Sequence, residues 1–145
     1  MRPIVRLATS TADRDAVFAV RHAVFVVGQN VPPEIERDDL DASADHVLAD
    51  VDGRVVGAGR LVVDGDTGVL GRLAVLADEQ GSGLGVQLVE LIEERARARG
   101  CRLLELHAQT YVREFYERLG YAAFGDVYDE AGIPHISMSK PLLDH

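Results

Sequence analysis

Three strand-forming runs in the middle of the chain, separated by short turn sequences, constrain its fold more than any other feature. The runs are His46–Val51, Arg54–Val63 and Thr67–Leu76. Asp52-Gly53 separates the first two, and Asp64-Gly65-Asp66 separates the second from the third. An Asp-Gly pair between two apolar runs is a strong signal for a β-hairpin. We therefore expect an antiparallel meander of three strands.

Helical and strand patterns on both sides of the meander predict an α+β fold. Strands on either side of a crossover helix can pair in parallel, whereas the meander must be antiparallel. The sequence thus predicts one domain over residues 1–145, with a mixed, mostly antiparallel sheet of about seven strands between helices, in α/β/α layers. The other expected elements are a strand at Ile4–Ala8, a helix at Thr11–Val27, a loop with a short helix at Glu34–Asp45, a helix at Val86–Ala96, a strand at Arg102–Ala108, a helix at Val112–Leu119, and strands at Tyr121–Tyr128 and Ile133–Met138.

Composition and charge exclude several classes of partner. The 145 residues carry a net charge of −9 with no basic tract, which argues against a nucleic-acid partner. No apolar run approaches the ~18 residues that a membrane helix needs, and no export signal is present, so we expect no membrane association and a cytoplasmic location. Cys101 is the single cysteine, and no pair of histidines has the spacing of a zinc motif, so we expect no metal.

A glycine-rich turn, Gln80–Gly85 with the sequence QGSGLG, lies where the third strand run ends and a helical pattern begins. Glycines leave backbone N–H groups uncovered at the positive end of a helix, which suits them to hold a phosphate group. The dinucleotide motif G-x-G-x-x-G and the triphosphate motif G-x-x-x-x-G-K-S/T both need other spacings, and no Lys follows Gly85. A turn that only lets strand and helix pack closely stays open as an alternative.

Two motifs give the whole chain a resemblance to the GNAT family of N-acetyltransferases. The family's acetyl-CoA-binding pattern, R/Q-x-x-G-x-G/A, is met by Gln80, Gly83 and Gly85, and FYERLGY at 115–121 resembles the family's F-Y-x-x-x-G-F/Y helix end. Stretches such as AVFVVGQNVPPEIERDDLD and DEAGIPHISM resemble the ElaA-type branch. That branch usually has Glu where this chain has Gly28, a role that Glu34 or Glu36 could take over.

The resemblance implies an acetyl-CoA site. In the family a backbone N–H of the strand before the glycine turn binds the acetyl carbonyl, which by position is that of Leu73, and Val75 pairs with the pantetheine arm. Backbone N–H groups from the turn hold the phosphates, with Ser82 where many members have a basic residue, and Gln109 replaces an Asn that contacts pantetheine. The implied cofactor-binding residues are Leu73, Ala74, Val75, Gln80, Gly81, Ser82, Gly83, Leu84, Gly85, Val86, Gln109 and Tyr116.

Catalytic candidates follow from the same resemblance and from side-chain chemistry. Tyr116 stands at the family's tyrosine position, and a phenol with a pKa near 10 suits the protonation of a thiolate; from helical spacing alone it would be a core aromatic. His46, His107 and His135 are all candidate bases. His135 is preferred because GIPH is part of the resemblance.

The substrate side is less defined by the sequence. Glu36 and Asp39, with Asp38 and Asp41, could attract a cationic amine, although we expect the acidic segment to be mainly a solvated surface. Arg60 and Arg72 lie in apolar strands, where they either bind an acidic group of the substrate or pair with that segment; the sequence favours the pairing.

These observations predict acetyl-CoA-dependent transfer of an acetyl group to a primary amine of a small molecule or peptide, directly within a ternary complex. A non-catalytic acyl-CoA sensor or interaction module with the same fold is the alternative. A homodimer is a possible assembly.

Overall fold

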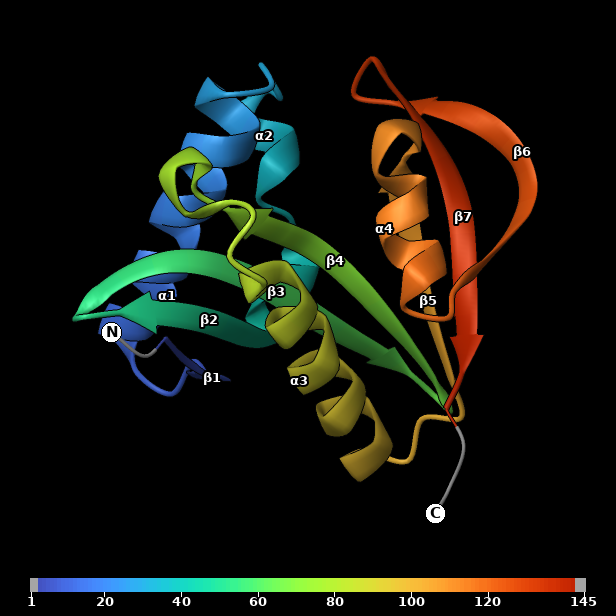
Figure 1. The fold of residues 1–145 in the computed structure, drawn as a ribbon, viewed down its shortest axis with the longest axis horizontal. Coiled ribbons are helices and arrows are strands. Elements are labelled where there is room, and N and C mark those ends of the chain that lie inside the picture. Colours follow the sequence, from blue (N-terminus) through green and yellow to red (C-terminus); the bar gives the residue numbers. More distant parts are fainter. Residues whose placement is uncertain (1–2, 143–145) are drawn as a thin grey trace.

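The computed structural model describes residues 3–142, which form one seven-stranded sheet covered by helices on both faces (Figure 1). The strand order is β1-β2-β3-β4-β5-β7-β6, and every neighbouring pair is antiparallel except β4 and β5. This confirms the predicted mixed, mostly antiparallel sheet. The strands are β1 Ile4–Leu7, β2 Asp45–Val51, β3 Arg54–Asp64, β4 Thr67–Val75, β5 Leu103–Gln109, β6 Ala122–Glu130 and β7 Ile133–Pro141.

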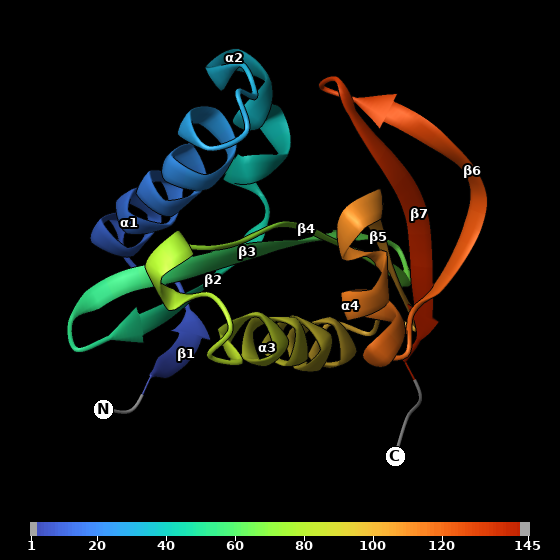
Figure 2. The same cartoon turned by 45° about the horizontal axis from the view of Figure 1, so that its top comes forward.

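The helices form two layers, one on each face of the sheet (Figure 2). A large apolar core joins α3 and α4 to one face, and a smaller core around Val17 and Val20 joins α1 to the other. The α-helices are α1 Thr11–Arg21, α2 Pro33–Glu36, α3 Leu84–Ala98 and α4 Arg113–Arg118. Short 3-10 turns occupy Asp39–Ala42, Ala77–Glu79 and Thr110–Val112.

Two tight turns have the same backbone conformation; the first confirms the predicted hairpin, and the second was not predicted. Asp52 and Gly53 both have positive φ (54° and 86°), as a two-residue type I′ turn between β2 and β3 requires. Ala131 and Gly132 adopt the same combination (53° and 78°) between β6 and β7. This second turn sets the register that places Glu130 next to the residues of β7.

The predicted helix over Thr11–Val27 is present, but it changes type along its length. It is the α-helix α1 to Arg21 and continues as a π-helix over His22–Val27. The apolar spacing of this segment looked helical, but periodicity alone does not distinguish an α-turn from a π-turn. The wider π-turn ends at Gly28, where a Cβ atom would lie 2.5 Å from the Val24 carbonyl oxygen. Glycine at this position therefore fits the local packing, whereas a Glu side chain would require the backbone to shift.

The parallel pairing of β4 with β5 is short, and this opens the sheet. Their ladder joins Thr67–Leu70 to Leu103–Leu106 and then ends, although both strands continue. On its other edge β4 carries a bulge, because Arg72 and Leu73 together stand opposite the single residue Gly59 of β3. Arg72 has a φ of 53°, which a non-glycine residue rarely adopts. A bulge bends its strand, and the last part of β4 diverges from β5.

A closed ring of ion pairs joins the acidic segment to α1 and to this part of the sheet. Three arginines alternate with three carboxylates, so the ring as a whole is neutral. The contacts run from Arg21 to Glu36 (2.8 Å), Glu36 to Arg72 (3.3 Å), Arg72 to Asp38 (3.3 Å), Asp38 to Arg60 (2.7 Å), Arg60 to Asp41 (2.9 Å) and Asp41 back to Arg21 (2.7 Å).

Most residues of the acidic segment are exposed, as expected, but the ring buries two of its carboxylates. Glu36 and Asp41 are only 4% and 7% exposed, and Arg21 is fully buried. Charges this deep are tolerated because each has a hydrogen-bonded partner of opposite sign. The pairing of Arg60 and Arg72 with this segment, which the sequence favoured, is present.

Electrostatics around the ring keep two of its carboxylates, Asp38 and Asp41, ionised. Burial by itself raises the pKa of Asp41, but hydrogen bonds from Arg21, from the Asp38 backbone and from Arg60 hold it well below its usual range. The hydrogen bond from Arg60 lowers the pKa of Asp38. Burial and repulsion by Arg60 and Arg21 lower the pKa of Arg72.

We predict that Asp41→Asn destabilises the protein by about 3 kcal/mol at pH 7, because it leaves Arg21 and Arg60 buried beside a neutral group. The matched control is Asp39→Asn, whose exposed side chain lies outside the ring. Urea unfolding followed by circular dichroism measures both variants.

A carboxylate with a depressed pKa stabilises the fold above about pH 4 and loses this contribution as the pH falls further. The difference between wild type and Asp41→Asn should therefore shrink at pH 3; equal stabilities at pH 7 would contradict a structural ring.

Candidate functional site

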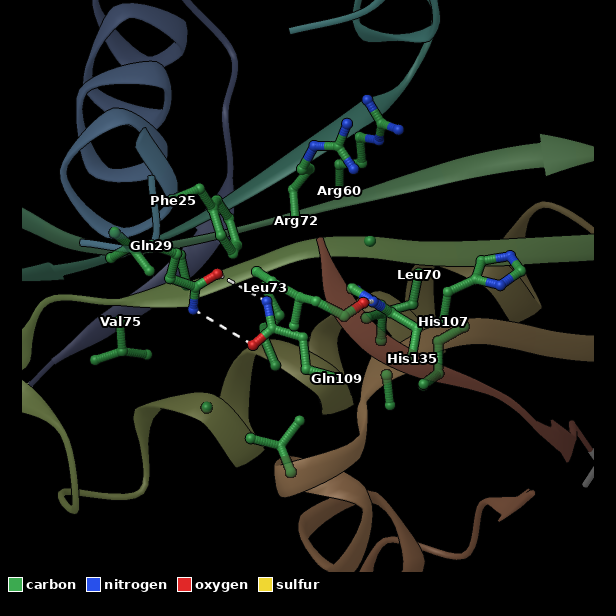
Figure 3. A pocket seen from close by; sticks show the side chains of 18 of the residues that line it. Phe25, Gln29, Arg60, Leu70, Arg72, Leu73, Val75, His107, Gln109 and His135 are labelled. Atoms are coloured by element: carbon green, nitrogen blue, oxygen red, sulfur yellow. Dashed lines mark hydrogen bonds between the residues drawn. The ribbon is translucent and has the colours of Figure 1, made fainter. Parts of the chain in front are cut away.

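A cavity of about 910 Å³ occupies the opening between β4 and β5 (Figure 3). Its walls come from the end of β4, the glycine turn, the start of α3, the end of β5, α4, the β6–β7 turn, and the segment after α1. Arg60 and Arg72 approach it from one side, whereas His107 and His135 approach from β5 and β7 (Figure 3). The glycine turn lies at one end of this cavity and the ion-pair ring at the other.

The glycine turn presents uncovered backbone N–H groups to the cavity. Gly81 and Gly83 have φ of 83° and 86°, and a Cβ at either would meet no atom within 4 Å, so their outer faces are open. Gly83 caps α3 without a side chain, and the first intrahelical bond to its carbonyl comes from Gln87. The N–H groups of Leu84, Gly85 and Val86 therefore have no partner within the helix. Such a terminus is suited to bind an anion.

The open edge of β4 offers a second set of backbone groups. The Leu76 N–H donates to the Val56 carbonyl at 2.8 Å, so these two residues form a hydrogen-bonded pair of the antiparallel ladder. Hydrogen-bonded and non-bonded pairs alternate, so Val75, opposite Gly57, points its N–H and carbonyl away from β3. Gln80 Nε2 donates to this Val75 carbonyl at 3.0 Å, which agrees with that orientation. The Val75 N–H is left facing the opening.

Two amide side chains meet across the opening. Gln109 Nε2 at the end of β5 donates to Gln29 Oε1 at 2.7 Å, and Gln29 Nε2 contacts Gln109 Oε1 in return at 3.4 Å (Figure 3). Gln29 also donates to the Tyr111 hydroxyl at 3.1 Å. The pair connects the segment after α1 to β5, so Gln109 lies in the cavity with its amide already engaged.

Tyr116 of α4 lines the cavity and also belongs to the core. It is 6% exposed and packs edge-on against Phe115 and Tyr121, with ring centroids 5.0 and 5.8 Å away. Burial raises the pKa of Tyr116 above its ordinary value near 10, so the hydroxyl stays protonated at physiological pH. Tyr116 is therefore a residue of the apolar core and also a residue of the cavity wall.

The three candidate histidines have different surroundings. His135 is buried, lines the cavity, and its Nδ1 lies 2.7 Å from the Ile133 carbonyl oxygen. Because a carbonyl only accepts, Nδ1 carries the proton, and the lone pair of the neutral ring is on Nε2. His107 also lines the cavity, with its Nδ1 2.7 Å from the Tyr128 hydroxyl. His46 is buried against the Asp41 carbonyl and is not among the lining residues.

The remaining sequence-based candidates lie at the edges of the site or outside it. Glu36, Arg60 and Arg72 line the cavity as members of the ring, whereas Asp39 is exposed and does not line it. Ser82 donates its hydroxyl to the Glu79 carbonyl at 2.6 Å instead of facing the cavity. Leu73, Ala74, Gly81, Gly83, Leu84 and Gly85 are lining residues, and Val86 contributes at most its backbone.

The residues of the cavity wall that sequence reasoning missed include Phe25, Gln29 and Glu130. Phe25 and Gln29 follow α1, and Glu130 ends β6. No local pattern marks Phe25 or Gln29, since Gln29 meets a partner 80 positions away. A usable signal for Glu130 was the EAGI sequence, because a two-residue turn pairs Glu130 with Ile133.

Within residues 3–142, no group of three or more His, Cys, Asp or Glu side chains is arranged to hold a metal ion. Over the same residues, no helix is long and apolar enough to cross a bilayer.

Comparison with known proteins agrees with this geometry. Residues 10–142 match the family described as the acetyltransferase (GNAT) domain. ElaA of Escherichia coli (strain K12) is 32% identical over 133 residues, which cover 88% of this chain and 87% of ElaA. YjcF of Bacillus subtilis (strain 168), named as an uncharacterized N-acetyltransferase, is 36% identical over 124 residues, covering 85% and 89% of the two chains.

Solved structures show the same fold over the whole chain. The crystal structure of E. coli ElaA has a TM-score of 0.83 at 28% identity and covers 96% of this chain and 98% of its own. An acyl-CoA N-acyltransferase from Pseudomonas aeruginosa has a TM-score of 0.83 at 31% identity, with the same coverage of 96% and 98%. The chain therefore belongs to the GNAT family of acetyltransferases, has ElaA among its relatives, and is an N-acetyltransferase.

Proposed function

We propose that the protein transfers the acetyl group of acetyl-CoA directly to a primary amine of a small molecule or peptide. The observation that carries this proposal is that one cavity contains both the uncovered N–H groups of the glycine turn and the unpaired edge of β4. A donor with a phosphate end and an amide-rich arm matches these two features in that order. The homodimer and the cytoplasmic location stay predictions of the sequence.

The donor would bind by backbone contacts. Its pyrophosphate would accept hydrogen bonds from the N–H groups between Gly81 and Val86, where the α3 dipole favours negative charge. The pantetheine arm would pair with Val75 as an added strand, next to Ala74 and Leu73. Gln80 supports this edge through its bond to the Val75 carbonyl, and Gln109 offers an amide to the arm once its bond to Gln29 exchanges.

The transfer needs three groups from the chain: a base, a hydrogen-bond donor to the oxyanion, and an acid. His135 Nε2 removes a proton from the ammonium, either directly or through one water, so that the nitrogen lone pair can attack the thioester carbon. The Leu73 N–H stabilises the negative oxygen that develops while the C–N bond forms. As the C–S bond breaks, Tyr116 gives its proton to the thiolate and recovers one from the acetylated nitrogen. Its raised pKa keeps that proton available.

The first prediction concerns donor binding. Acetyl-CoA at 100 times its Kd should stabilise the wild type by about 2.7 kcal/mol, visible as a higher melting temperature. Gly83→Asp should abolish this stabilisation, because it adds a side chain and a negative charge where the phosphates would lie. The matched control is Gly53→Asp, since Gly53 has the same φ of 86° and equally open surroundings in the distant β2–β3 turn. Both variants carry the same backbone strain, so only the first should lose the response to acetyl-CoA. No response in the wild type would refute both the enzyme and the sensor hypotheses.

The second prediction concerns Tyr116. Tyr116→Phe should lower kcat about 100-fold, the lower end of what a general acid contributes, while the Kd for acetyl-CoA stays nearly unchanged. Release of CoA measured with a thiol reagent, together with calorimetric titration, gives both quantities. Tyr121→Phe is the control, because it removes a nearby buried hydroxyl, 2.8 Å from Glu93, that does not line the cavity. It should affect stability and not kcat; an unchanged kcat in Tyr116→Phe would exclude the acid role.

The third prediction concerns His135. His135→Asn keeps a donor for the Ile133 carbonyl but removes the base, so kcat/KM at pH 7 should fall about 100-fold. The deficit should shrink towards pH 10, where a primary amine with a pKa near 10.4 loses its proton to solvent. A pH profile of both proteins measures this. A deficit that does not depend on pH would indicate a structural role for His135.

A further inference from the structure

Part of the cavity wall is apolar. Phe25 and Val31 follow α1, Ile35 and Leu40 belong to the acidic segment, and Ile133 begins β7. Ile35 and Leu40 are 51% and 48% exposed, so both present apolar surface at this cavity. Concave apolar surface with a few polar groups is typical of a small-molecule site. These side chains and His135 line the same cavity.

Most of the charge at the end of the cavity formed by the ring is already neutralised. Glu36, Asp38, Arg60 and Arg72 all line the cavity, but each is paired within the ring, whose arginines and carboxylates are equal in number. The ring therefore offers little net attraction to a cation or an anion. Burying a further charge beside it would cost desolvation without a free partner.

Glu130 is different from these four residues. Its carboxylate lines the cavity outside the ring, its side chain is half exposed, and its Oε2 lies 3.5 Å from His135 Nε2. The type I′ turn at Ala131-Gly132 fixes this position, because it pairs Glu130 with Ile133, two residues before His135. The Glu130 carboxylate thus lies beside the Nε2 atom of His135, the buried histidine of the cavity wall.

Building on the proposed transfer reaction, we propose that the acceptor is an apolar monoamine: a primary amine with an aliphatic or aromatic body, no carboxylate and no second ammonium group. Glu130 receives the ammonium and holds it at His135 Nε2, which takes the proton. The apolar body lies against Phe25, Ile35 and Leu40. A carboxylate on the acceptor meets the neutral ring and Glu130. A second ammonium beside the ring meets carboxylates that are already paired, because Glu79, the other lining carboxylate outside the ring, directly precedes the glycine turn.

Matched acceptors test this assignment. We expect kcat/KM to be at least about tenfold higher for 2-phenylethylamine than for phenylalanine, which adds only a carboxylate, and likewise higher for hexylamine than for 1,6-diaminohexane. Kanamycin serves as a polar polycation and should be a poor acceptor. CoA release at saturating acetyl-CoA gives the rates. The phenylalanine arm also tests whether Arg72, at the edge of the ring, accepts a carboxylate.

Two variants test the residue itself. Glu130→Gln should raise KM for 2-phenylethylamine about tenfold with little change in kcat or in acetyl-CoA affinity, since only the attraction to the ammonium is lost. Asp129→Asn is the control, because adjacent strand residues point to opposite faces and Asp129 does not line the cavity. Equal effects of both variants would overturn the role of Glu130.

The outcomes separate this inference from the proposed function. Faster turnover of phenylalanine, diaminohexane or kanamycin would overturn the apolar monoamine while upholding acetyl transfer. Binding of acetyl-CoA without CoA release on any amine would refute the transfer reaction and this inference together.

Discussion

The ring of alternating arginines and carboxylates is the interaction on which the site depends. It holds the acidic segment against α1 and β3, and it includes Arg72, the residue in the left-handed region at the β4 bulge. A non-glycine residue in that region costs about 1–2 kcal/mol, which the contacts of the Arg72 guanidinium with Glu36 and Asp38 help to offset. The bulge in turn accompanies the divergence of β4 from β5, and the cavity occupies the resulting opening.

The same arrangement divides the cavity by chemistry. At one end, glycines and a helix N-terminus present backbone N–H groups that suit phosphates. At the other end, the charges of the ring are paired with one another, and the Glu130 carboxylate lies outside the ring beside His135. His135 comes from β7 and Tyr116 from α4, and the fold brings both side chains to the same cavity. The division explains how one cavity could bind an anionic donor and a cationic acceptor without mixing the two.

Local signals predicted much of the fold correctly. The Asp52-Gly53 turn, the glycine turn before α3 and the crossover from β4 to β5 follow from turn chemistry, helix capping and chain connectivity. The expected helix over Thr11–Val27 is present, but the apolar spacing does not reveal that it is a π-helix from His22 onwards. Most residues of the acidic segment are exposed, as expected, but Glu36 and Asp41 are buried. The burial of these two carboxylates depends on three arginines up to 36 positions away, which no local charge pattern contains.

The strands, the hairpin turn at Asp52-Gly53 and the glycine turn could be predicted from the amino-acid sequence, because each depends on the conformational preferences of a few adjacent residues. Which polar side chains have a partner within the protein depends on the tertiary structure. It engages Glu36, Arg60 and Arg72 in a neutral ring, joins Gln29 to Gln109, and leaves Glu130 beside His135. The physical reason is that the availability of a charge or an amide depends on its partners in space, and here these come from distant strands and helices.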